Sequence, residues 1–128
     1  MGGDEEGTNA ARRARLLRTL QALSEPNRMR IVELLRQGPL TVGEIAERLD
    51  LRQPQTSKHL KVLAEHGVVT VRAEANKRIY GLRQEPFRDL EDWLEPLRRT
   101  LEERYENLDA YLRRVQRERS PRGDEDEG

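Results

Sequence analysis

The chain has 128 residues, with 24 Lys and Arg against 24 Asp and Glu, no cysteine and 34% hydrophobic residues. This length fits one domain with a modest core, and the lack of cysteine excludes disulfides, thiolate metal sites and a thiol nucleophile. No apolar run approaches the roughly 18 residues of a membrane span, and the first ten residues do not resemble a signal peptide, so we expect a cytoplasmic protein.

The net charge of zero hides a strong asymmetry along the chain. Residues 51–83 carry seven basic and two acidic side chains, whereas both ends are acidic. A basic middle segment is typical of nucleic-acid binding. The ends are also poor in apolar residues, so we expect residues 1–7 and 118–128 to be disordered tails.

Two helices are expected first. Over residues 9–23, four leucines fall on one helical face, with arginines on the other. A second helix is expected to follow, with Ser24 as its N-cap and Pro26 in its first turn. Gly38 and the proline after it should end this helix.

The next segment predicts a helix-turn-helix. Thr41 and Glu44 have the spacing of a capping box, which starts a short helix that ends near Asp50. A second helix is expected from about Pro54 to His66, and two short helices joined by a tight turn form this motif. A β-branched run and an alternating run within 68–82 then predict a β-hairpin with a polar tip over 73–77, in the position of a wing.

The last pattern is a long amphipathic helix over 84–117. Leu94, Leu101, Leu108 and Val115 repeat every seven residues, and a second apolar row is interrupted by Arg104. Pro96 predicts either a kink or a helix start just before it. An apolar seam longer than its own domain favours a homodimer, and the expected interface residues are Leu16, Leu20, Leu94, Leu97, Leu101, Leu108 and Tyr111.

Several of these segments resemble one family. LSEPNRMRIVELL, QPQTSKHLKVLAEHGVV and KRIYGL, in this order, are similar to the winged helix-turn-helix core of ArsR/SmtB-type repressors over about residues 18–83. The resemblance implies a mainly α fold with a small β-hairpin, a long C-terminal dimerisation helix, and a homodimeric transcriptional repressor that an inducer releases from its operator. It leaves the inducer unidentified.

The chain departs from the metal-sensing members of that family. Residues 44–50 lack the family's cysteine pair, and residues 84–128 contain no histidine. The chain is instead similar to a cysteine-free branch, whose W-L-x-P element matches residues 93–96. We therefore expect no metal and no cofactor, because isolated carboxylates are poor ligands for transition metals.

The resemblance and the residue types together indicate how double-stranded DNA would be bound. Polar side chains at the start of the second motif helix can reach base edges in the major groove, lysines suit phosphates, and the hairpin tip suits phosphates or the minor groove. Thr56 is included although its place is often filled by an inward-facing β-branched residue, and Tyr80 is expected to pack on the core. The expected DNA-binding residues are Gln53, Gln55, Thr56, Ser57, Lys58, His59, Lys61, Arg72, Asn76, Lys77 and Arg78.

Three other interpretations remain open at this point. A MarR-like regulator that senses small organic ligands shares the winged helix, and a winged-helix protein–protein module would not bind DNA at all. An enzyme is the least favoured, because the sequence has no nucleophile–base pair and no phosphate-binding glycine loop.

Paired recognition helices about 34 Å apart would predict an inverted-repeat operator.

Overall fold

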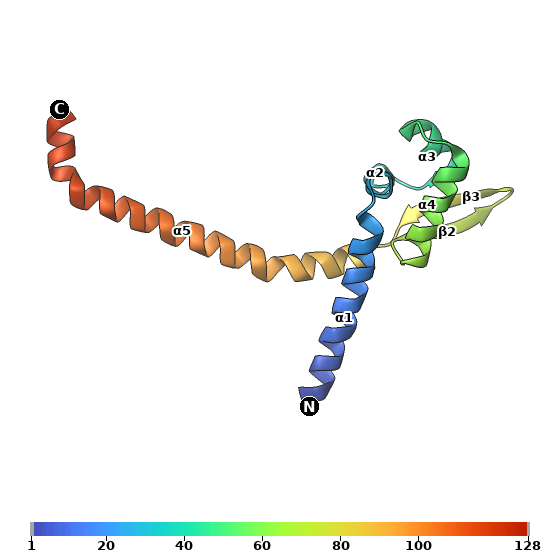
Figure 1. Cartoon of the computed structure of the whole chain (residues 1–128), viewed down its shortest axis with the longest axis horizontal. Helices are drawn as coiled ribbons and strands as arrows, with labels where there is room; N and C mark the ends of the chain where they lie inside the picture. The colour runs from blue at the N-terminus through green and yellow to red at the C-terminus, as the bar shows by residue number, and fades with distance from the viewer. Residues whose placement is uncertain (1, 128) are drawn as a thin grey trace. The chain divides into compact units, whose positions relative to one another are not determined.

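The computed structural model describes residues 2–127, with side chains described over 7–119. The chain divides into an N-terminal unit, Met1–Leu90, and a C-terminal unit, Glu91–Gly128. The expected fold class is confirmed: five helices and a small antiparallel sheet occur within the described residues (Figure 1). In chain order the elements are α1 (Gly2–Leu23), α2 (Pro26–Leu35), β1 (Leu40–Thr41), α3 (Val42–Leu49), α4 (Gln53–Glu65), β2 (Val69–Glu74), β3 (Lys77–Leu82) and α5 (Glu85–Glu127).

The capping box at the start of α3 is confirmed. The Thr41 hydroxyl accepts a hydrogen bond from the Glu44 amide at 3.2 Å, and Glu44 Oε1 accepts one from the Thr41 amide at 3.0 Å. The Thr41 hydroxyl also donates to Glu44 Oε1, at 2.9 Å. The two hydrogen bonds that the Glu44 carboxylate accepts, first from the Thr41 amide and then from the Thr41 hydroxyl, lower the pKa of Glu44. At its other end α3 stops at Asp50, whose left-handed backbone (φ 54°) begins the tight turn into α4.

The N-cap of α2 differs from the expectation. Glu25, and not Ser24, caps this helix, because its side chain accepts a hydrogen bond from the Arg28 amide at 2.8 Å. The Ser24 hydroxyl instead donates to the Gln21 carbonyl at 2.7 Å, and so belongs to the end of α1.

The sheet has three antiparallel strands in the order β1-β3-β2. The two-residue strand β1 was not predicted, because it is defined by its pairing with β3, where Leu40 lies opposite Tyr80. The hairpin tip is also shorter than expected: Glu74 pairs with Lys77, which leaves only Ala75 and one further residue in the turn. Ala75 adopts a φ of 56° there.

The root of the hairpin is tightly packed at Gly81. A Cβ placed on Gly81 would lie 3.3 Å from Thr70 Oγ1 and 3.4 Å from Pro39 Cγ. These distances are at the short end of van der Waals contact, so β3 approaches Pro39 closely because residue 81 has no side chain.

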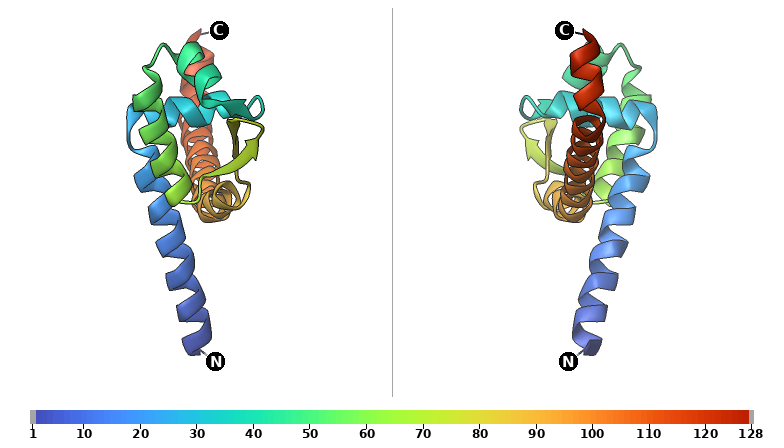
Figure 2. Two further views of the ribbon diagram at one scale, coloured as in Figure 1. Left: turned by 90° about the vertical axis from the view of Figure 1, so that its right-hand side faces the viewer. Right: turned by 90° about the vertical axis from the view of Figure 1, so that its left-hand side faces the viewer.

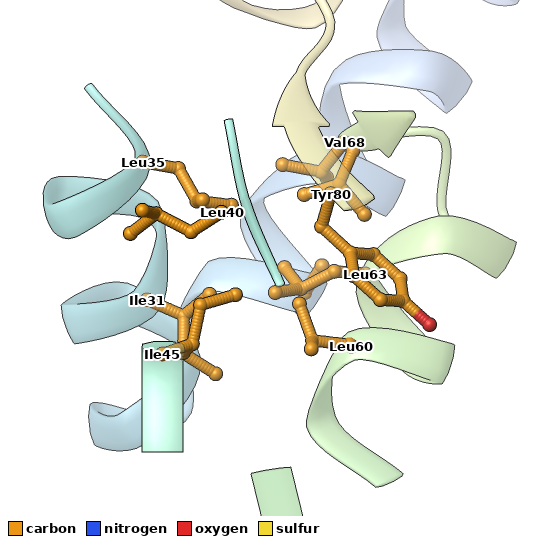
Figure 3. Close-up of a cluster of buried hydrophobic side chains, with 10 residues drawn as sticks. Ile31, Leu35, Leu40, Ile45, Leu60, Leu63, Val68 and Tyr80 are labelled. Carbon is orange, nitrogen blue, oxygen red and sulfur yellow. The ribbon is translucent and has the colours of Figure 1, made fainter. Parts of the chain in front are cut away.

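A single apolar core holds the helix-turn-helix and the hairpin together. Side chains from α2, α3 and α4 meet those of the sheet in this core (Figure 3). Figure 2 shows the backbone of the same helices and of the hairpin in two further views. The Tyr80 ring reaches from β3 toward Leu60 and Leu63 of α4 and is 6% exposed, which confirms its expected packing role. Phe87 packs on the same core and Asp89 pairs with Arg15 of α1 at 3.2 Å, so the first turns of α5 belong to the N-terminal unit.

The long helices differ from the expected domain boundaries. The backbone is helical from Gly2 and as far as Glu127, so α1 and α5 continue into the segments 1–7 and 118–128 that composition predicts to be tails. Arg and Glu are good helix formers, so a segment that cannot form a core can still be helical. Side chains of 1–6 and 120–128 lie outside the described part, and disorder of the ends stays a prediction. The helix α5 starts at Glu85 and continues through Pro96, so of the two alternatives for Pro96 the helix start just before it is wrong.

Candidate nucleic-acid interface

The outward face of α4 is polar and exposed. Thr56, Leu60 and Leu63 are fully buried, and their spacing of four and three residues fixes which side of the helix faces the core. The opposite side therefore faces solvent. Five of the predicted DNA-binding residues of α4 are exposed: Gln53, Gln55, Ser57, Lys58 and Lys61.

The first turn of α4 leaves its amides available. Arg52 occupies the N-cap position but forms no capping hydrogen bond through its side chain, as its residue type predicts, and Pro54 lies in the first turn. The first amides of a helix carry the positive end of its dipole. The start of α4 can therefore attract an anionic group.

The hairpin tip adds cationic side chains. Arg72, Asn76, Lys77 and Arg78 are all exposed, as a wing requires. Arg72 pairs with Glu74 at 3.3 Å, whereas Lys77 and Arg78 form no ion pair with any acid of the described residues. Lys77 and Arg78 are therefore more available than Arg72 to bind an anion.

A hollow of about 460 Å³ lies between the hairpin tip and the two motif helices. It is lined by the start of α3 (residues 41–43), by Gln53 of α4 and by residues 76–78 of the hairpin. The start of α4 and two cations face this hollow, which favours an anion such as a phosphodiester.

Thr56 does not belong to this interface. Its side chain is fully buried, and its hydroxyl donates to the Arg52 carbonyl at 2.9 Å within α4. The prediction that Thr56 contacts DNA is therefore wrong, because the residue lies on the core side of the helix.

His59 is also turned away from the exposed face. Its side chain is 16% exposed, and its Nδ1 lies 3.6 Å from Glu25 Oε2 at the start of α2. The other ring nitrogen, Nε2, is buried and has no hydrogen-bond partner within the described residues. His59 therefore lies mostly off the exposed face of α4, and its contact with a base stays a prediction. The sequence contained the signal, because His59 lies three residues after Thr56 and four before Leu63 and so adjoins the buried face.

The predicted dimer residues separate into exposed and buried ones. Leu20 is 39% exposed and can contact a partner, but Leu16 is only 5% exposed and packs within its own chain. Leu17 was not among the expected interface residues, but it is 58% exposed and occupies the outward position that was expected for Leu16. The helical periodicity of the leucines predicts an apolar stripe on α1, but it does not indicate which edge of the stripe faces the core.

The C-terminal unit presents a long row of exposed apolar side chains. Each of its predicted interface residues is between 45% and 56% exposed, and Glu95 binds Arg98 and Arg99 on the polar side of the helix, which lowers its pKa. Three further members of the row were missed: Trp93, Tyr105 and Leu112. Tyr105 follows the interrupting Arg104, so the apolar row continues past it by a spacing of four residues from Leu101.

No group of three or more His, Cys, Asp or Glu side chains is placed to hold a metal ion within the part of the chain that the structure describes. In that same part, no helix combines the length and the apolar character needed to cross a membrane.

A polar helix of this kind beside a cationic hairpin defines a winged helix-turn-helix. A family model described as a helix-turn-helix domain matches residues 23–72. The HTH-type transcriptional regulator Rv2034 of Mycobacterium tuberculosis is 45% identical over 65 residues, which are 51% of this chain and 61% of that protein. The chain spans between 56% and 64% of the length of the first curated relatives it matches.

Solved structures extend the likeness to the fold. A crystal structure of an ArsR family transcriptional regulator is 30% identical, with a TM-score of 0.61, over 70% of this chain and 92% of that one. The homodimeric winged helix-turn-helix DNA-binding domain of Mb0332 from Mycobacterium bovis is 27% identical, with a TM-score of 0.57, over 69% and 82% of the two chains. The chain belongs to the ArsR family of transcriptional regulators, as its residues indicated.

Proposed function

We propose that the chain is a homodimeric transcriptional repressor that binds an inverted-repeat operator in double-stranded DNA in the cytoplasm. The observation that carries this proposal is the exposed polar face of α4 beside a cationic hairpin tip. Several curated relatives are named as repressors and one as an activator, which favours repression.

In this proposal α4 is the recognition helix and enters the major groove. Gln53, Gln55 and Ser57 lie at its first turns, where side chains reach base edges. A glutamine can pair with adenine through two hydrogen bonds, and a serine can accept or donate at several bases. These three side chains would therefore distinguish one DNA sequence from another.

The cations would hold the backbone. Lys58 and Lys61 on α4 and Lys77 and Arg78 on the hairpin have no acidic partner within ion-pair distance among the described residues. Each is thus available to a phosphate without first breaking an ion pair. The hollow between the hairpin tip, Gln53 and the start of α3 would accommodate one such phosphate.

Dimerisation would supply the second recognition helix. The apolar rows of α1 and of the C-terminal unit are each exposed within residues 7–119, and large exposed apolar surfaces typically mark interfaces. A related DNA-binding domain is homodimeric. Two-fold symmetry then predicts an operator with two half-sites one helical turn apart.

Fluorescence anisotropy tests this function directly. The labelled duplex is the DNA upstream of the reading frame, and the control is a scrambled duplex of the same length and composition. We expect tight binding to the native duplex alone at physiological salt, saturating at two chains per site. Equal binding to both duplexes would leave only backbone contact, and no binding at low salt would favour a protein–protein module instead.

A further inference from the structure

One carboxylate joins the start of α2 to the recognition helix. Glu25 Oε2 accepts a hydrogen bond from the Arg28 amide at 2.8 Å, and the same oxygen lies 3.6 Å from His59 Nδ1. The side chains of Glu25 and His59 are 31% and 16% exposed, so the contact is largely shielded from water. Shielding strengthens an electrostatic interaction, because less solvent screens it.

Arg28 extends this contact to α1. Its Nε donates to the Ala22 carbonyl at 2.7 Å, and Ala22 is fully buried near the end of α1. Two hydrogen bonds and the contact between Glu25 and His59 therefore form a polar path, which runs from Ala22 through Arg28 and Glu25 to His59. This path is here named the Glu25 network. It connects α1, which carries the exposed Leu17, to the middle of the recognition helix.

Packing alone does not explain a histidine at this position. The Nε2 of His59 is buried and has no hydrogen-bond partner in the described part of the chain, and burying an unpaired polar atom is unfavourable. An apolar side chain would fill the same space without that cost. What the imidazole offers instead is its Nδ1, which faces Glu25.

We propose that His59 and Glu25 are positioning residues, which fix the recognition helix relative to α1 and so set how its base-reading face meets the major groove. This inference rests on the function proposed above. Hydrogen bonds to base edges tolerate little displacement, and a dimer must present two helices about 34 Å apart at once. A link from the recognition helix to α1 serves both requirements.

The wild-type protein, three variants and one control variant test the inference by anisotropy on the operator and on the scrambled duplex. The variants are Glu25→Gln, His59→Ala and their combination; Gln retains an oxygen for the α2 cap. Glu33→Gln removes the same charge from an exposed position of α2 and serves as the control. Circular dichroism checks folding, and His59→Gln replaces His59→Ala if the latter does not fold.

We expect each single variant to bind the operator about tenfold more weakly and the scrambled duplex within about twofold of the wild type, while Glu33→Gln changes neither. The double variant should be no weaker than either single one, because both remove the same contact. Wild-type operator affinity in Glu25→Gln would overturn the inference. Additive losses in the double variant would do so as well, since they indicate a direct base contact by His59.

A second measurement does not depend on DNA. In NMR spectra, Glu25→Gln should shift the ring resonances of His59 and leave those of His66, whose Nδ1 lies 2.9 Å from the Val62 carbonyl. Unchanged His59 resonances would overturn the inference while the proposed function stands. A wild-type protein that does not distinguish the operator from the scrambled duplex would overturn the proposed function, and the inference with it.

Discussion

Replacing Lys77 and Arg78 together by alanine should change the salt dependence of DNA binding. Both side chains are exposed at the hairpin tip and unpaired among the described residues, so each can neutralise one phosphate. A dimer would lose four phosphate contacts, and each contributes about 0.9 to the slope of log K against log salt. The slope should therefore flatten by about 3.6, which is roughly a 150-fold smaller loss of affinity between 50 and 200 mM salt.

The assay is anisotropy on the operator and on the scrambled duplex over that salt range. The matched control is Arg98→Ala with Arg99→Ala, which removes the same charge from a part of α5 where both arginines bind Glu95. The hairpin variant should weaken both duplexes about equally, because phosphate contacts carry no sequence information. An unchanged slope in the hairpin variant, or an equal flattening in the control, would refute the assignment of the tip to phosphate.

Three further predictions concern stability, base readout and assembly. The lowered pKa of Glu44 stabilises the protein above the ordinary value of 4.5, and this contribution is lost as the pH falls through the lowered value. Glu44→Gln should therefore flatten the fall of Tm on acidification below about pH 4.5; parallel Tm curves would contradict this. Thr56→Val should leave operator affinity within about twofold, whereas Gln55→Ala should weaken operator binding about tenfold and spare the scrambled duplex. Leu20→Asp should raise the dimer dissociation constant at least about tenfold in sedimentation with the fold intact, whereas Leu16→Asp should lower the free energy of unfolding by about 3 kcal/mol. A Leu20→Asp protein that sediments like the wild type would remove α1 from the interface.

Local chemistry explains which parts of the fold were predictable. The capping box at Thr41, the end of α3 at Asp50 and the inward packing of Tyr80 each depend on neighbours a few residues away or on simple alternation. The family resemblance added the order of these parts. The strand β1 could not be found in this way, because two residues become a strand only through pairing with β3, almost forty residues later.

The errors in the candidate site have a common physical cause. His59, Thr56 and Leu16 were judged by residue type and by nearness to a functional segment. Thr56 and Leu16 lie on the inward faces of their helices, and His59 lies at the edge of such a face. At the edge of a buried face, the orientation of a side chain depends on the groups that the neighbouring helix presents to it. For His59 that group is the Glu25 carboxylate, whose capping role itself differs from the expected N-cap at Ser24.

The absence of a side chain at Gly81 determines where the hairpin tip can reach. The tip residues 77 and 78 lie three or four positions along β3 from Gly81, about 10 to 13 Å at the usual rise per residue. Any methyl group at residue 81 would press on Pro39 and Thr70 and require a displacement of a few tenths of an ångström at the root of the strand. A displacement at the root of a hairpin also moves its tip. In the proposed complex with DNA, the residue at position 81 would therefore affect where Lys77 and Arg78 meet the phosphates.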